Sequence, residues 1–138
     1  MNKQIETIML PADDAKLQLV NDFIHSFLPD DVDNLLVNQI DLAVEEIFVN
    51  IAHYAYSGRG GEAEVSCILS DGVITISFTD KGKPFNPLEK EDPDITLSAE
   101  ERKIGGLGIF LTKKFMDKVW YVYEDGRNKL SFSKKIIQ

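Results

Sequence analysis

The longest periodic stretch of the chain is DLAVEEIFVNIAHYAY, residues 41–56, and its pattern predicts an amphipathic helix. At about 100° per residue one face of this helix is apolar, formed by Leu36, Ile40, Ala43, Val44, Ile47 and Ile51. The acidic segment at 30–34 offers caps for its start, and the glycine-rich segment at 57–61 ends it. Glu46 and Asn50 lie four residues apart beside the apolar face, so we expect their side chains to be neighbours.

Shorter alternating stretches on both sides of this helix predict strands. Residues 3–10 are typical of a first strand, followed by a helix from residue 13 or 14 to about 27. Residues 62–69 and 73–80 alternate around an Asp-Gly turn, and 119–124 and 129–136 alternate around a second one, with a helix at 105–117 between the two hairpins. We therefore predict an α+β fold, a two-layer α/β sandwich whose mixed, mostly antiparallel sheet is covered on one face by three helices.

The bulk properties of the chain limit its partners. Its 138 residues suit a single domain, 1–138. A formal net charge of −8 argues against direct binding to nucleic acid or anionic lipid, because both attract clustered Lys and Arg. Cys67 is the only cysteine, which excludes a disulfide within the chain and a cysteine-based zinc site. No apolar run approaches the roughly 18 residues of a membrane span and the start carries no targeting signal, so we expect a cytoplasmic protein.

Polar side chains interrupt two of the predicted apolar faces. Glu46 and Asn50 offer oxygen atoms that suit a hard cation such as Mg²⁺, although a pair of ordinary polar residues on a surface helix has the same pattern. Asp80 continues the inward-facing series of the strand at 73–80 and would need a buried hydrogen-bond donor. The alternative is a turn in which Asp80 bonds its own backbone. Gly82 then permits a close approach of the backbone or a positive φ.

A glycine-rich motif, KIGGLGIFLTKKF at 103–115, lies where a loop turns into a helix. The backbone N–H groups around Gly105, Gly106 and Gly108 would form an anion site at the start of that helix. The motif is not a Walker A loop, because no Lys-Ser or Lys-Thr follows the glycines. No parallel strand directly precedes it, so it does not open a Rossmann unit either. Alone, such a turn is weak evidence of a phosphate site.

The motifs together resemble a known superfamily. Glu-x-x-x-Asn on a helix, Asp-x-Gly-x-Pro-Phe after a strand and Gly-Gly-Leu-Gly before a helix occur in this order. They look like the N, G1 and G2 boxes of the GHKL (Bergerat-fold, histidine-kinase-like) ATP-binding superfamily. EEIFVNIAHYAY, DKGKPFNP and GGLGIFLTKKFMDKV are similar in detail to the RsbW-type anti-sigma-factor serine kinases. The resemblance covers nearly the whole chain and implies the Bergerat ATP-binding fold.

The resemblance also implies ATP and Mg²⁺ as cofactors and gives each motif a role. Asn50 would coordinate Mg²⁺, and Glu46 would be the general base that activates the attacking hydroxyl. Asp80 would accept a hydrogen bond from the adenine amino group, with Gly82 and Pro84 beside the base. The phosphates would contact backbone N–H groups of the third motif, namely those of Gly105, Gly106, Leu107 and Gly108.

Further positions take weaker roles from the same resemblance. Residues 88–104 would form the ATP lid, with Arg102 or Lys103 available to a phosphate. His53 matches a histidine often found in the helix of this family, although packing explains it as well. Glu45 is a poorer candidate for the base, because its helical position points away from Asn50.

The function implied is that of an ATP-dependent serine/threonine kinase. Such a protein would phosphorylate a STAS-domain anti-sigma antagonist, sequester a sigma factor and form a homodimer. One alternative is a regulatory switch module that binds ATP without transferring phosphate, and another is an ATPase regulator of a different signalling protein. Glu46 favours the kinase, since a protein that only binds nucleotide needs no base beside Asn50.

Overall fold

The computed structural model describes residues 3–89 and 107–137, whose strands form one five-stranded sheet. The strands lie in the order β1-β2-β3-β5-β4, and every pairing between neighbours is antiparallel. The prediction of a mostly antiparallel sheet is confirmed, and no parallel pair occurs among the described strands. The bounds of the strands are close to those predicted: β1 (Gln4–Pro11), β2 (Glu62–Ser70), β3 (Val73–Asp80), β4 (Lys118–Glu124) and β5 (Arg127–Lys135).

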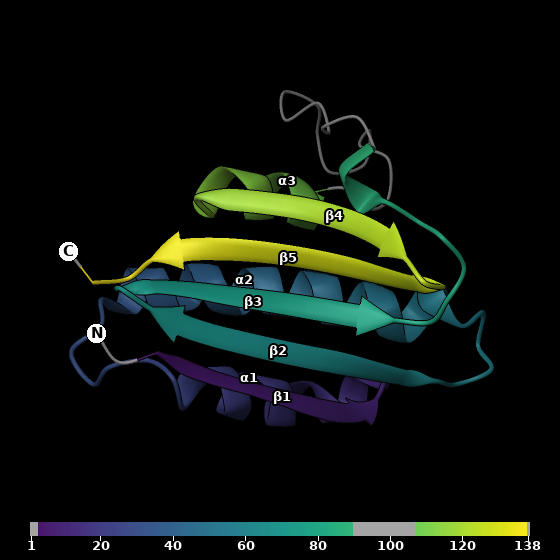
Figure 1. Ribbon diagram of the computed structural model, residues 1–138, viewed down its shortest axis with the longest axis horizontal. Helices are drawn as coiled ribbons and strands as arrows, with labels where there is room; N and C mark the ends of the chain where they lie inside the picture. The colour runs from purple at the N-terminus through teal and green to yellow at the C-terminus, as the bar shows by residue number, and fades with distance from the viewer. Residues whose placement is uncertain (1–2, 90–106, 138) are drawn as a thin grey trace.

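The helices cover one face of this sheet and leave the other face open (Figure 1). The α-helices are α1 (Leu17–His25), α2 (Asn34–Asn50) and α3 (Leu107–Phe115). Shorter turns of helix are η1 (Asp14–Lys16), η3 (Pro87–Glu89) and the π-helical segment η2 (Ile51–Ala55), which continues α2 directly. This arrangement confirms the predicted α+β sandwich with three helices on one face. Within residues 3–89 and 107–137, no helix is both long and apolar enough to cross a membrane.

Acidic side chains cap the first helical segments where the sequence predicted caps. The Asp33 carboxylate accepts a hydrogen bond of 3.0 Å from the backbone N–H of Leu35 at the start of α2. Asp13 accepts one of 3.0 Å from the N–H of Ala15 at the start of η1. Each bond satisfies a backbone donor that the first turn of a helix leaves without a partner.

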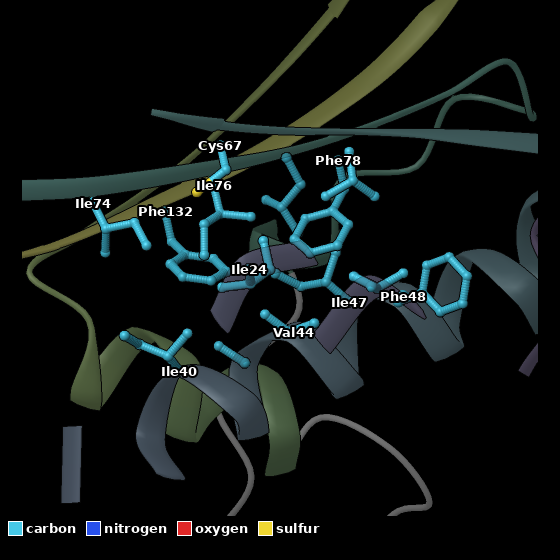
Figure 2. Packing of buried hydrophobic residues seen from close by; sticks show 14 of the residues in the cluster. Ile24, Ile40, Val44, Ile47, Phe48, Cys67, Ile74, Ile76, Phe78 and Phe132 are labelled. Carbon is cyan, nitrogen blue, oxygen red and sulfur yellow. The ribbon is translucent and has the colours of Figure 1, made fainter. Parts of the chain in front are cut away.

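The hydrophobic core lies between α2 and the covered face of the sheet (Figure 2). Most of the apolar stripe predicted on the long helix is buried there and meets side chains of β3 and β5 (Figure 2), whereas Leu36 near the start of α2 is only partly buried. Burial raises the pKa of the Cys67 thiol in this core to about 12, as expected for a small structural residue. The largest fully buried side chains include Ile40, Val44, Phe48, Ile74, Ile76, Phe78 and Phe132.

The strand register brings two polar residues together at one end of this core. Asp80, the last residue of β3, pairs directly with Asn128 near the start of β5. Both side chains are only 6% exposed. The end of η2 lies at the same edge of the sheet, because the backbone N–H of Lys83 donates to the carbonyl of Ala55 at 3.3 Å. A polar site is therefore built where the long helix and the central strands end together.

Candidate functional site

A pocket of about 350 Å³ opens between the end of α2 and the ends of the central strands. It brings together three residues that the sequence analysis singled out, Glu46, Asn50 and Asp80. Its remaining lining is largely apolar or aromatic and includes Ile47, Ile51, Tyr54, Phe78, Phe85, Ile109, Tyr121 and Leu130. A concave apolar site with a few convergent polar groups is the usual form of a small-molecule site.

Asp80 forms the polar floor at one end of the pocket. Its Oδ1 accepts hydrogen bonds from the backbone N–H of Gly82 at 2.9 Å and from Nδ2 of Asn128 at 3.0 Å. Both readings of Asp80 from the sequence are therefore partly correct: the carboxylate bonds its own loop and also has a buried donor. Neither bond uses Oδ2, so among the described residues this oxygen is left for a ligand in the pocket.

Gly82 makes the close backbone approach that the sequence predicted, and its neighbour is the protein itself. A Cβ at this position would collide with the backbone carbonyl of Ala55, the last residue of η2. The π-helical turn thus sets the position of the Ala55 carbonyl against the loop that follows β3. Such turns occur mostly as single bulges in α-helices, often at functional sites. Pro84, in the same loop, is exposed and lines a second hollow adjoining the pocket.

Glu46 and Asn50 form the other polar end of the pocket. Both are partly buried, and Nδ2 of Asn50 donates to Oε1 of Glu46 at 3.0 Å. This confirms that the two side chains are neighbours on the helix. The bond orients the carboxamide so that its carbonyl oxygen Oδ1 remains available as a ligand. Glu45 is exposed and does not line the pocket.

Gly108, in the first turn of α3, packs against the carboxylate of Glu46. A Cβ there would collide with Cδ and Oε2 of Glu46. The carbonyl of Gly108 accepts a hydrogen bond of 2.8 Å from the buried hydroxyl of Thr112, which braces this turn. Leu107 is exposed and does not line the pocket. The other positions predicted for this motif and for the lid lie outside the described residues. They are Gly105 and Gly106 of the motif and residues 90–104 of the lid, with Arg102 and Lys103 among them.

The oxygen atoms at the Glu46 end fit a Mg²⁺ ion held mainly by phosphates. Asn50 offers one hard oxygen, Oδ1, beside the carboxylate of Glu46. Within the two described segments, no group of three or more His, Cys, Asp or Glu side chains could hold a metal by itself. Mg²⁺ commonly takes one or two protein oxygens together with the phosphates of its substrate.

Two further side chains fix η2 from outside the pocket. The hydroxyl of Tyr56 donates to the carbonyl of Glu62 at 2.5 Å and accepts from the N–H of Lys81 at 2.9 Å. Burial raises the pKa of Tyr56, so the hydroxyl keeps its proton as a donor. His53 is exposed, and its Nε2 lies 2.6 Å from Oδ2 of Asp14. It joins η2 to η1 and does not line the pocket.

Asn128 and Tyr121 were not predicted from the sequence, although both line the pocket. Asn128 donates to Asp80, and the hydroxyl of Tyr121 donates to Oδ1 of Asn128. One signal was present for Asn128: it follows an Asp-Gly turn and takes the inward phase of its strand together with Leu130 and Phe132. A polar residue in that phase is the same signal that identified Asp80.

Comparison with known proteins agrees with this geometry. The model of the histidine kinase-like ATPase domain family matches residues 10–134. The chain is also similar in fold to a crystal structure of the RsbU and RsbW domains of Rv1364c from Mycobacterium tuberculosis. That match has a TM-score of 0.66 and 15% sequence identity, and it covers 96% of this chain and 32% of the other.

Relatives with related names share about a quarter to a third of their aligned residues with this chain. A serine-protein kinase RsbW of Listeria monocytogenes serovar 1/2a is 28% identical over 95 residues, which are 65% of this chain and 60% of the relative. An anti-sigma F factor of Caldanaerobacter subterraneus is 27% identical over 94 residues, 68% and 66% of the two chains. A serine-protein kinase RsbW of Halalkalibacterium halodurans is 32% identical over 92 residues, 60% and 53%. The matched region thus spans less than two thirds of each relative.

Proposed function

Because the chain belongs to the histidine kinase-like ATPase domain family, we propose that it binds ATP with Mg²⁺ and phosphorylates a serine or threonine of a partner protein. The observation that carries this proposal is the hydrogen-bonded pair of Glu46 and Asn50, which shares one pocket with the buried Asp80. An acid that can bind adenine at one end would position the nucleotide, and a general base beside a metal ligand at the other would serve phosphoryl transfer.

In this proposal the residues position the reactants and move one proton. Asp80 accepts a hydrogen bond from the amino group of adenine, and Asn50 offers Oδ1 to the metal. When bound, Mg²⁺ neutralises charge on the phosphates. Glu46, oriented by Asn50 through Oε1, takes the proton of the acceptor hydroxyl. The hydroxyl oxygen bonds to the γ-phosphorus as the bond to the β-phosphate oxygen breaks, and ADP leaves.

The sigma factor proposed as a partner follows from the names of the relatives, and the STAS-domain antagonist and the homodimer follow from the resemblance of the motifs to the RsbW-type family. Those relatives are called serine-protein kinase RsbW and anti-sigma F factor. By analogy, we propose that this chain binds a sigma factor, phosphorylates a STAS-domain antagonist of that binding and forms a homodimer. The net charge of −8 gives no support to a direct contact with nucleic acid.

A switch module that binds ATP without transferring phosphate is the second candidate. The specific observation that fits it is that two protein hydrogen bonds hold Oδ1 of Asp80 at the end of the pocket where adenine would bind, which serves binding alone. A general base at Glu46, beside Asn50, has no use in such a module. The two candidates therefore differ in whether the Glu46 end of the pocket acts on a hydroxyl.

One experiment tests the proposal in two steps. Calorimetry with ATP and ADP in the presence of Mg²⁺ should show binding, and no binding at millimolar nucleotide would overturn both candidates. The protein is then incubated with ATP, Mg²⁺ and STAS-domain proteins encoded near its own gene, and phosphoserine or phosphothreonine is sought by mass spectrometry. Transfer to one of these proteins supports the kinase. Nucleotide binding without transfer to any protein favours the switch module.

A further inference from the structure

The carboxamide of Asn128 is a junction between two strands and the loop after β3. Its Nδ2 donates to Oδ1 of Asp80 at 3.0 Å and to the carbonyl of Lys83 at 2.9 Å, with the carbonyl of Gly82 at 3.4 Å. Its Oδ1 accepts from the N–H of Phe85 at 3.0 Å and from the hydroxyl of Tyr121. An asparagine has two donors and two acceptor positions, so this amide is fully used.

The chemistry of its neighbours allows the amide only one orientation. The backbone N–H of Phe85 can only donate, so it must face the amide oxygen, whereas the carbonyl of Lys83 can only accept and must face the nitrogen. Rotating the amide by 180° would therefore oppose donor to donor and acceptor to acceptor in a site that is 6% exposed. The N–H directed at Asp80 is consequently fixed by the fold.

Tyr121 supports this orientation from the neighbouring strand. Its hydroxyl donates to the amide oxygen of Asn128, and both residues line the pocket. Burial is the main cause that raises the pKa of Tyr121, so the phenol stays neutral and keeps its donor proton. The chain of contacts thus runs from Tyr121 through Asn128 to Asp80.

The consequence for Asp80 is that one of its two carboxylate oxygens is already assigned. Oδ1 accepts from Gly82 and Asn128, so the plane of the carboxylate is held and Oδ2 is the oxygen left for a ligand. Without the Asn128 donor, one bond from Gly82 remains, and the carboxylate can rotate about it. A freely rotating carboxylate meets a ligand donor less well than one held in place.

We propose that Asn128, supported by Tyr121, is a positioning residue that holds Asp80 in the orientation that selects purines carrying an exocyclic amino group at the position of the adenine amine. This inference rests on the proposed binding of an adenine nucleotide. It adds a residue that contributes to base selectivity through Asp80, since the donors and acceptors of its own amide are already used within the protein.

Selectivity between two nucleotides separates this role from a general loosening of the loop. ATP and purine riboside triphosphate differ in the 6-amino group, so their affinity ratio reports the bond to Asp80. We expect Asn128→Ala to lower the ratio about tenfold, the scale of a lost hydrogen bond involving a charged group. Most of that loss should fall on ATP, with the affinity for the purine analogue changed much less.

A nearby asparagine provides the matched control. Asn86 lies in the same loop, and its side chain accepts from the N–H of Leu88 at 2.9 Å and not from a group that contacts Asp80. Asn86→Ala should therefore leave the affinity ratio unchanged. Tyr121→Phe removes only the outer donor and should lower the ratio about two- to fivefold, less than Asn128→Ala.

The outcomes distinguish this inference from the proposed function. A ratio that stays at the wild-type value in both Asn128→Ala and Tyr121→Phe overturns it, as does an equal loss of affinity for both nucleotides. If Asn128→Ala does not fold, Tyr121→Phe decides by the same ratio. In an Asp80→Asn background, the Tyr121→Phe change should have no further effect on the ratio, and a full further loss would contradict action through Asp80. A wild-type protein that binds neither nucleotide overturns the proposed function, and the inference with it.

Discussion

The two ends of the pocket are built in different ways. At the end where we propose that adenine binds, Asp80 and Asn128 come from paired strands, are each 6% exposed and share a buried hydrogen bond of 3.0 Å. At the opposite end, Glu46 and Asn50 come from one helix, are partly buried and are joined by a hydrogen bond of 3.0 Å. The first end is held mainly by hydrogen bonds within the protein and offers Oδ2 of Asp80 to a ligand, whereas the second is less constrained and offers oxygen atoms of both side chains.

This difference has a physical cause and a functional meaning. A buried polar group without a partner costs about 1–3 kcal/mol, so the amide of Asn128 and Oδ1 of Asp80 find their partners within the fold. The end with Glu46 and Asn50 is partly open to solvent, where water can solvate the free oxygens until they meet a substrate. Recognition of the nucleotide would then rely on a prebuilt site. Phosphoryl transfer would rely on groups that remain free to react. Substitutions should therefore affect binding at one end and rate at the other.

The largest effect should come from Glu46→Gln. The change keeps the size of the side chain and an oxygen that can accept from Asn50, but it removes the base. We expect phosphoryl transfer to fall by about 10²–10⁴-fold, the usual worth of general-base catalysis, while the affinity for ATP changes little. Single-turnover transfer and calorimetry measure the two quantities.

The adjacent residue gives a matched control for this variant. Glu45 is exposed on the same helix and does not line the pocket, so Glu45→Gln should transfer phosphate at the wild-type rate. Wild-type transfer by Glu46→Gln would remove the base from its assigned role. An equal loss in both variants would point to a change in the helix and not in the chemistry.

Asp80→Asn should mainly weaken binding. It replaces a charged acceptor by a neutral amide in a buried site whose donors come from Gly82 and Asn128. We expect the free energy of ATP binding to become less favourable by about 1–3 kcal/mol. Asp71→Asn, at the exposed hairpin turn before β3, is the control and should leave binding unchanged. A transfer rate at saturating ATP that falls more than the affinity would contradict the division between the two ends.

Gly108→Ala tests whether the packing of α3 against Glu46 positions the proposed general base. The added methyl group would collide with the Glu46 carboxylate, the movable end of a flexible side chain, so we expect displacement of the base and not unfolding. Alanine favours a helix over glycine by about 1 kcal/mol, which works against a loss of stability. Transfer should slow by roughly tenfold, since misplaced catalytic groups lose much of their effect. In a Glu46→Gln background the same change should have little further effect on the rate, and an undiminished tenfold loss there would place the effect elsewhere.

The fold and one half of the site could be predicted from the chain because they depend on local pattern. Alternation and Asp-Gly turns located the hairpins, and the spacing of Glu46 and Asn50 alone made them neighbours. Asp80 was recognised because it is a polar residue in the otherwise apolar, inward-facing series of its strand. Asn128 carried the same signal, but its importance depends on the register of β3 with β5, which joins residues far apart in the sequence.

Other features depended on three-dimensional contacts that no local pattern contains. The need for glycine at position 82 comes from the carbonyl of Ala55, and this carbonyl is placed by a π-helical turn. The segment 51–55 continues the periodicity of α2, so nothing in its sequence indicates a change of helix type. The closeness of Gly108 to Glu46 likewise reflects the packing of α3 on α2, and not the glycine motif alone.

The smallest effect should come from His53, which the resemblance left between a functional and a structural role. Its ring is 2.6 Å from the carboxylate of Asp14, both side chains are about half exposed, and neither lines the pocket. An exposed ion pair contributes only about 0.2–1 kcal/mol, so His53→Gln should lower the free energy of unfolding by no more than that. Transfer should stay within about twofold of wild type, because the proposed proton acceptor is Glu46, which lies in the pocket, whereas His53 does not. Urea unfolding and single-turnover transfer measure these effects. A tenfold loss of transfer at unchanged stability would place His53 beside Glu46 and Asn50 as a third residue of this helical stretch that acts in phosphoryl transfer.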